Sequence, residues 1–160
     1  MIKTRIVNLA LFFLLSLFSH SVYALTDADK LAIEGVIAKF NQSWNEQQGA
    51  GISNLYDNDA DFINIYGMHI TGNSDIELRH KQILQRFLKN SKLSTNNINL
   101  KEITPEVVSA YVIWTLKGYR EPKADDKIPG ETREGVFTHI FLHKNNHWLI
   151  TATQNTIFPK

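Results

Sequence analysis

Apolar residues recur every three or four positions in two segments of the chain, and this is the spacing of one face of an α-helix. The first segment can be capped by Thr26 or Asp27 and should end near "QQGAG" (47–51). Its apolar positions are Ile33, Val36, Ile37, Phe40 and Trp44. The second begins at "NSD" (73–75), and its apolar face consists of Ile76, His80, Ile83, Leu84 and Phe87. Between the two, "ISNLYDND" (52–59) is interpreted as a further short helix.

Alternation of apolar and polar residues predicts strands in the rest of the chain. "DFINIYG" (61–67) places Phe62, Asn64 and Tyr66 on one face, and "MHITG" is its hairpin partner. Four more strands follow, at 97–104, 107–120, 134–144 and 147–158. Helices followed by a long antiparallel run indicate an α+β domain, with three N-terminal helices packed on one face of a curved, mainly antiparallel sheet.

The first residues have the three-part pattern of a secretory signal peptide. Lys3 and Arg5 precede an apolar run of 13 residues, "IVNLALFFLLSLF", and "SHSVYA" then ends in small residues. The apolar run is shorter than the roughly 20 residues that a membrane-spanning helix needs. We therefore expect cleavage after Ala24, which leaves 25–160 as a single domain in the periplasm or outside the cell, with no membrane attachment.

Composition excludes several functional classes. Without Lys3 and Arg5, 15 basic and 16 acidic residues remain, so the mature chain lacks the basic footprint of a nucleic-acid-binding protein. The chain has no cysteine, and so neither disulfides nor thiolate metal ligands. No glycine-rich turn joins a strand to a helix, which argues against a nicotinamide cofactor. We expect no cofactor and no metal.

The order of elements and several motifs resemble the nuclear-transport-factor-2-like superfamily, and within it the SgcJ/EcaC-type branch near the SnoaL-like proteins. The motifs are "FNQSWNEQQGAGISNLYDNDADFINIYGMHITG", "SDIELRHKQIL", "REGVFTHIFL" and "HWLITATQNT". The resemblance implies a cone: a strongly bent sheet wrapped around three helices, with an internal pocket and dimerisation through the open sheet face. The superfamily contains isomerases, dehydratases, cyclases and non-catalytic modules, so the fold alone does not select a function.

Three residues are candidates for catalysis. His80 lies on the apolar face of the second long helix, and in the resemblance this face points into the cone. An imidazole there can act as a general base, because its pKa is near neutrality. Tyr66 and Asn64 can donate hydrogen bonds to a developing oxyanion. The alternatives are a core histidine that is bonded to a neighbour, and an outward face on which Asn64 and Tyr66 are solvated.

Five residues are candidates for ligand contact. Trp44, Tyr56 and Trp114 can form aromatic walls, although large aromatic residues are more commonly plain core. In "QNT" one amide should face the pocket. Strict alternation from Trp148 favours Gln154, and a bulge would favour Asn155 instead.

The hypothesis that the protein is an enzyme is weakened by the lack of a clearly inward-facing carboxylate. Asp61 and Glu134 are the nearest candidates for a proton shuttle, and neither clearly belongs to an inner face. His139 and His143 are expected to point outward from their strand. We therefore expect an exported protein that binds a small, largely apolar molecule, either as a binder or as a cofactor-independent isomerase, dehydratase or cyclase. The alternative is an accessory domain that uses the same fold to bind a protein.

Overall fold

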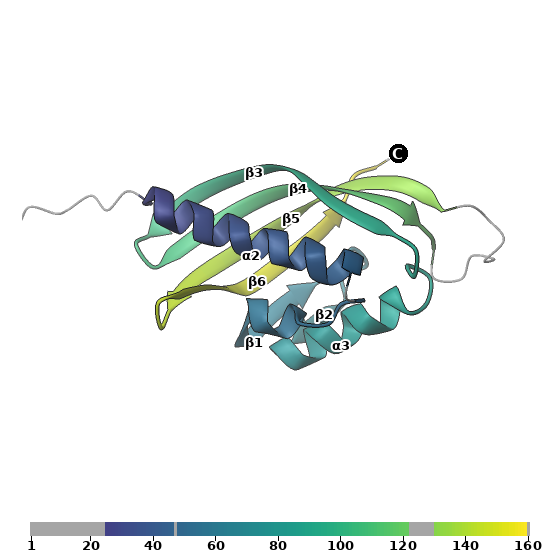
Figure 1. The fold of residues 1–160 in the computed structure, drawn as a ribbon, viewed down its shortest axis with the longest axis horizontal. Coiled ribbons are helices and arrows are strands. Elements are labelled where there is room, and N and C mark those ends of the chain that lie inside the picture. Colours follow the sequence, from purple (N-terminus) through teal and green to yellow (C-terminus); the bar gives the residue numbers. More distant parts are fainter. Residues whose placement is uncertain (1–24, 47, 122–129, 160) are drawn as a thin grey trace, which may run out of the picture.

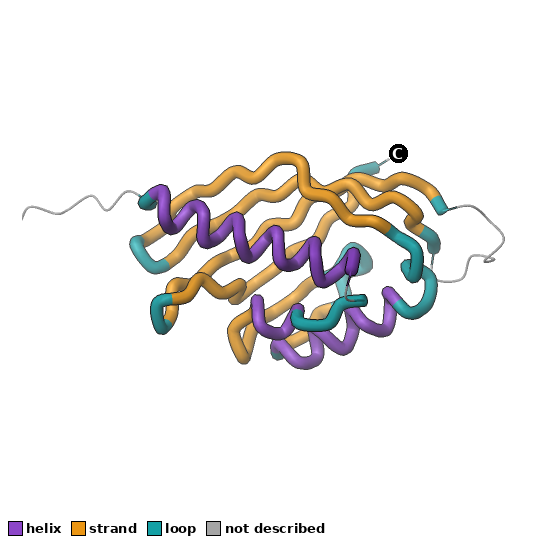
Figure 2. Tube along the Cα trace, viewed as in Figure 1, coloured by secondary structure: helices purple, strands orange, loops and turns teal. Residues whose placement is uncertain are grey.

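The computed structural model describes residues 25–46, 48–121 and 130–159. One layer is a curved six-stranded sheet, and the helices cover its concave face (Figures 1 and 2). The elements, in chain order, are α2 (Asp27–Glu46), the 3₁₀ helix η1 (Ile52–Leu55), β1 (Tyr56–Ile63), β2 (His69–Thr71), α3 (Asn73–Leu84), β3 (Lys92–Thr104), β4 (Val107–Tyr119), β5 (Glu131–Lys144) and β6 (His147–Ile157). The predicted signal peptide lies outside the described residues.

Helix α2 begins as the sequence predicts. Thr26 is the capping residue, since its Oγ1 accepts a hydrogen bond from the backbone N–H of Asp29 at 3.1 Å. The predicted apolar face is buried against the sheet, with Ile33, Ile37, Phe40 and Trp44 on it. In Figure 1, α2 runs along the sheet while α3 lies below its C-terminal end, beside β1 and β2.

The prediction of three α-helices is wrong in one place. Only Ile52–Leu55 is helical in the 52–59 segment, as one 3₁₀ turn, and the backbone is extended from Tyr56 onward. Tyr56 pairs with Ile150 of β6, so this stretch finds its hydrogen bonds in the sheet. A tertiary partner decides its conformation, because a four-residue helical turn has little stability of its own.

The sheet has the order β2-β1-β6-β5-β4-β3. Every neighbouring pair is antiparallel except β1 and β6, which are parallel. The mainly antiparallel α+β architecture is therefore confirmed. Several boundaries differ from the prediction: β3 begins at Lys92 instead of residue 97, β5 begins at Glu131 instead of residue 134, and β1 ends at Ile63, before Asn64 and Tyr66.

A bulge in β6 reverses the inward and outward faces of the strand. Ile140 pairs with Ala152 but Phe141 pairs with Ile150, which leaves Thr151 as the extra residue. Before the bulge Trp148 and Ile150 point inward, and after it Thr153 and Asn155 do so. Gln154 is consequently exposed, and the preference for it over Asn155 was wrong.

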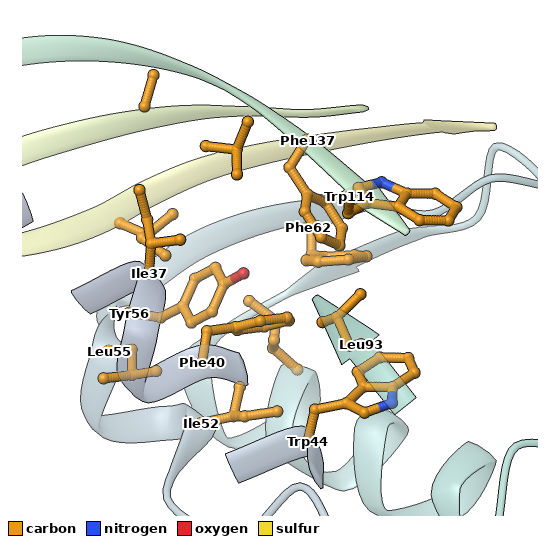
Figure 3. Close-up of a cluster of buried hydrophobic side chains, with 14 of the residues drawn as sticks. Ile37, Phe40, Trp44, Ile52, Leu55, Tyr56, Phe62, Leu93, Trp114 and Phe137 are labelled. Atoms are coloured by element: carbon orange, nitrogen blue, oxygen red, sulfur yellow. The ribbon is translucent and has the colours of Figure 1, made fainter. Parts of the chain in front are cut away.

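The core lies between α2 and the concave face of the sheet. Figure 3 shows aromatic rings from both layers in contact, with Phe40 and Trp44 of α2 below Phe62, Trp114 and Phe137 of the strands. Among the described residues, no helix is both long and apolar enough to span a membrane.

Candidate functional site

A hollow opens at the end of the core where α2 stops. Its volume is about 80 Å³. This is of the order of the engineered apolar cavity of about 150 Å³ that holds benzene, and well below the roughly 300–1,000 Å³ of drug-sized sites. Its apolar walls are Trp44, Phe62, Ile65, Ile70, Ile83, Phe87, Leu88, Trp114, Leu116 and Phe137. The polar groups that face it belong to Asn64, Tyr66, Arg79, His80, Tyr119 and Asn155.

His80 forms the polar part of the hollow on the α3 side. Its ring is 3% exposed and stands edge-on to Phe62, with centroids 5.0 Å apart, and to Phe40 at 5.5 Å. Nδ1 lies 2.7 Å from the carbonyl oxygen of Ile76, one turn back on the helix. Since a carbonyl only accepts, Nδ1 carries the proton of the neutral ring and Nε2 holds the lone pair.

Nε2 of His80 is left without a partner among the described residues. It is also not one of the sealed unpaired side-chain atoms in that part of the chain, which are Asn41 Oδ1 and Arg133 Nε. The acceptor nitrogen therefore keeps access to the hollow. Burial lowers the pKa of His80 to about 4, and the bond to Ile76 offsets this only in part while the positive charge of Arg79 adds to it. The ring is thus neutral at physiological pH.

Asn155 and Trp114 form the opposite, sheet side of the hollow. The indole Nε1–H of Trp114 donates to Oδ1 of Asn155 at 3.0 Å. This bond fixes the orientation of the amide, so its Nδ2 group is the end left for a ligand. No described residue accepts a hydrogen bond from that Nδ2.

Tyr66 closes the mouth of the hollow. Its hydroxyl donates to Glu121 Oε2 at 3.1 Å, and its oxygen lies 2.8 Å from the hydroxyl oxygen of Tyr119. Tyr119 donates to the other oxygen of Glu121, also at 3.1 Å. Burial raises the pKa of Tyr66, although the bond with Tyr119 opposes this, so the hydroxyl stays protonated.

Asn64 reaches the hollow from a turn and not from the predicted strand. Its Oδ1 accepts from the backbone N–H groups of Tyr66 and Met68 at 2.9 and 3.0 Å. Gly67, with φ of 77°, completes this turn. The turn also brings in Ile65, which alternation had placed on the opposite face from Asn64. The Nδ2 group of Asn64 has no acceptor among the described residues.

Two candidate residues are absent from the lining. Tyr56 lies deeper in the core, where its hydroxyl is 3.1 Å from Oγ1 of Thr153 and burial raises its pKa. Gln154 is exposed, and its Nε2 donates to the backbone oxygen of Asn155 at 3.3 Å. Neither residue is in a position to contact a molecule in the hollow.

Two features escaped the sequence reasoning. Arg79 lines the hollow, although it precedes His80 and lies off the apolar face of the helix. His139 was expected to point outward, but it is 2% exposed and its Nδ1 lies 2.8 Å from Oγ1 of Thr153. The signal for His139 was available, because residues two apart in a strand share a face, and Phe137 and Phe141 on either side of His139 are both buried.

The hollow contains no carboxylate from the described residues. Asp61 is half-exposed and holds His69 at 2.6 Å on the β1–β2 hairpin, and Glu134 is exposed beside Thr115. The part of the chain that the structure describes also has no group of three or more histidine, cysteine, aspartate or glutamate residues arranged to hold a metal ion. The chemistry that the site itself offers is therefore that of a neutral imidazole, two amides, two phenols and a guanidinium.

Comparison with known proteins shows which solved structures have a similar fold. No family model and no curated protein matches the sequence. Among solved structures, an uncharacterised protein with a cystatin-like fold from Caulobacter vibrioides is 22% identical, with a TM-score of 0.74 over 81% of this chain and 89% of that one. A putative scytalone dehydratase from Novosphingobium aromaticivorans is 12% identical, with a TM-score of 0.70 over 82% and 85% of the two chains.

A type 2 hexachlorocyclohexane dehydrochlorinase, LinA, is similar in shape as well. It is 11% identical, with a TM-score of 0.71 over 82% of this chain and 86% of that one. At such identities the likeness concerns the path of the backbone, and the SgcJ/EcaC-type branch stays a prediction. The chain has the cystatin-like fold that these structures share, and its membership of the nuclear-transport-factor-2-like superfamily stays a prediction.

Proposed function

We propose that the hollow binds a small, largely apolar molecule, about the size of one ring, that donates a hydrogen bond to His80. The observation that carries this proposal is the free Nε2 of a neutral imidazole whose other nitrogen is held by Ile76. A desolvated acceptor without a protein partner costs about 1–3 kcal/mol. A ligand hydroxyl, or an acidic C–H in a reactive one, would remove that cost.

The same geometry supports proton transfer without a cofactor. Nε2 of His80 would take a proton from the ligand, and the Nδ2 groups of Asn155 and Asn64 would donate to the oxygen on which negative charge develops. Because the pKa of His80 is about 4 in the empty hollow, the ring is a weak base until a nearby negative charge stabilises its protonated form. This favours eliminations and isomerisations in which a good leaving group or an adjacent carbonyl makes the proton acidic.

The neighbours in fold agree with this class of chemistry. The names of two of them, a dehydratase and a dehydrochlorinase, describe eliminations. These activities belong to those proteins, and they support the proposal only as examples of what this fold can carry.

The test uses ligand-observed and histidine-observed NMR on the chain from residue 25 onward. Phenol, titrated at neutral pH, should shift the ¹⁵N resonance of Nε2 of His80 and the indole N–H of Trp114. H80L replaces the imidazole by an apolar side chain of similar size. It should weaken phenol binding about ten-fold, which corresponds to one lost hydrogen bond of about 1.4 kcal/mol. H147N, at the exposed first residue of β6, is the control. If phenol leaves both resonances unmoved, the proposal fails.

We propose that a second surface of the protein binds a partner, and that this partner is another copy of this chain. The convex face of β4, β5 and β6 carries two adjacent rows of partly exposed apolar residues: Val107, Leu142 and Leu149 in one row, and Ile140 and Ala152 in the next. An exposed apolar patch on a sheet supports an interaction site there. Sedimentation analysis should show a dimer, and I140E should convert it to a monomer. A monomeric parent chain would contradict this proposal and would favour a different protein as partner.

Export is the remaining part of the proposal, and it depends on residues 1–24 alone. Expression of the full chain with its own N-terminus in a bacterial host should yield a periplasmic or secreted product that begins at Leu25. Intact-mass measurement of the product decides this, since a retained N-terminus would contradict cleavage after Ala24.

A further inference from the structure

The polar groups around the hollow are almost all donors. Nδ2 of Asn64 and Nδ2 of Asn155 have no acceptor among the described residues, and the guanidinium of Arg79 offers five N–H groups. Nε2 of His80 is the one acceptor in this set that is left unused.

Arg79 is the least expected of these donors. It is partly buried where it lines the hollow, yet none of the ion pairs found in the described residues involves it. It also makes none of their side-chain hydrogen bonds or ring contacts. Long cationic side chains that are partly buried are normally paired, because desolvating a charge without a partner is costly.

Of the acidic residues near Arg79, Glu77 and Glu121 are engaged elsewhere, and Asp75, one turn earlier on α3, is exposed and forms no ion pair with Arg79. Glu77, two positions earlier, accepts from the backbone of Gly51 and Ser53 and from the side chains of Ser53 and Lys81. Glu121 accepts from the two tyrosine hydroxyls at the mouth. Neither of these carboxylates therefore neutralises the positive charge of Arg79. This charge is one of the causes that lower the pKa of His80 and keep its ring neutral.

We infer that the ligand of the hollow is a compact organic acid, whose apolar body lies among Phe62, Trp114 and Phe137 and whose carboxylate pairs with Arg79. This inference rests on the proposed function, since it names the chemical class of the molecule that the hollow takes. A planar guanidinium matches a carboxylate with two parallel hydrogen bonds. Asn64 can add a further donor from the turn that borders the same opening.

The chain offers a matched control for Arg79. Arg86 lies on the segment just after α3, is exposed, and borders a separate basic cleft with Lys89 and Arg120 instead of the hollow. Replacing either arginine by glutamine removes one positive charge from the same side of the molecule. A loss of ligand affinity caused by general electrostatics would therefore appear in both variants. The loss of a specific ion pair with the ligand would appear only in R79Q.

The experiment titrates benzoate and its neutral isostere benzamide into the chain from residue 25 onward, with NMR shifts of the Trp114 and Asn155 side chains as the readout. Benzoate should bind at least about ten-fold more tightly than benzamide, and R79Q should remove that preference while R86Q keeps it. R79K should restore part of the preference, because it retains the charge without the fork.

Three outcomes overturn the inference. If benzamide binds as well as benzoate and R79Q changes neither, the hollow is a binding site for neutral molecules and the proposed function survives alone. If neither compound shifts the side chains of the hollow, and phenol also fails, the proposed function fails with it. If benzoate shifts only residues around Arg86, and inorganic phosphate does the same, the protein attracts anions to the basic cleft without a specific site.

Discussion

Trp114 of β4 donates a hydrogen bond to Asn155 of β6 at 3.0 Å, although β5 lies between their two strands. The residue of β5 that pairs with Trp114 is Gly135. A Cβ there would lie 2.2 Å from Cζ2 of Trp114 and 2.3 Å from the backbone oxygen of Thr156. The indole reaches β6 because β5 has no side chain at this position, and the sheet-side wall of the hollow depends on that one glycine.

The first prediction follows from this crossing. G135A should destabilise the folded protein by about 1–3 kcal/mol, the usual cost of overpacking a core, and should displace the indole from Asn155. Chemical denaturation gives the stability, and the NMR shift of the indole N–H reports the lost hydrogen bond.

Gly35 in α2 provides the comparison. A Cβ there meets nothing within 4 Å, so G35A should stabilise the protein by about 0.5–1 kcal/mol through helix propensity. A loss of stability in G35A, or no change in G135A, would contradict the packing described here.

The adjacent amides of β6 give a second prediction. N155A leaves the Nε1–H of Trp114 without its acceptor and should cost about 1–2 kcal/mol, together with loss of ligand affinity. Q154A, one residue earlier but on the exposed face, should change stability by less than about 0.5 kcal/mol. Equal effects in thermal or chemical denaturation would show that the bulge at Thr151 does not set the faces of the strand.

The two buried histidines make stability depend on pH in the mildly acidic range. Burial lowers the pKa to about 4 for His80 and to about 3 for His139, while both should have pKa values near 6.5 in the unfolded chain. Unfolding therefore takes up protons below about pH 6.5. Stability is full above that pH and falls toward pH 4, by up to about 1.4 kcal/mol per pH unit for each histidine.

Urea denaturation at several values between pH 7 and pH 4.5 checks this dependence. H139N, whose amide can still bond with Thr153, should roughly halve the slope of stability against pH, because one of the two groups no longer titrates. H147N changes an exposed histidine and should leave the slope near that of the parent chain. A parent chain with no loss of stability in this range would show that these rings are not buried as neutral groups.

Glu77 should stabilise the junction between α3 and η1. Burial acts to raise its pKa, but hydrogen bonds from Lys81 and Ser53 outweigh this and lower the pKa to about 2. A carboxyl group with a depressed pKa stabilises the folded state fully above its unfolded value near 4.5, and this contribution is lost as the pH falls toward 2.

E77Q should accordingly lower the unfolding free energy by about 1–3 kcal/mol at neutral pH, with the difference shrinking as the pH approaches 2. The measurement is denaturation of parent and variant in parallel at both pH values. E46Q, at the exposed end of α2, is the matched control for the loss of one negative charge. A deficit in E77Q that is constant with pH would mean that its charge is not what the backbone of Gly51 and Ser53 recognises.

The predictions were correct for features that depend on the spacing of apolar residues within a single helix. The three-to-four spacing of Ile33, Ile37, Phe40 and Trp44 predicted α2 and its buried face, and the same spacing placed His80 on the inner side of α3. These faces follow from the geometry of a single helix, which is periodic whatever surrounds it. Trp44 and Trp114, two of the candidate aromatic residues, line the hollow, and their contact with a ligand stays a prediction.

The predictions were wrong where two segments that are far apart in the chain jointly determine the local structure. Tyr56 is extended because β6 pairs with it, and Asn155 replaces Gln154 in the hollow because β5 and β6 differ by one residue at Thr151. No local pattern in either strand records this bulge. His139 was missed although the local pattern was sufficient, since it shares one face of β5 with Phe137 and Phe141.

The amino-acid sequence by itself determined the α+β order, the buried face of each long helix and the neutral charge balance, because these depend on residues close together in the chain. Only the tertiary structure decided that Nε2 of His80 and the guanidinium of Arg79 have no partner among the described residues, and that Asn155 turns its amide toward the same space. Each of these depends on which hydrogen-bond partners lie within about 3 Å after folding, and residues that are far apart in the chain supply them.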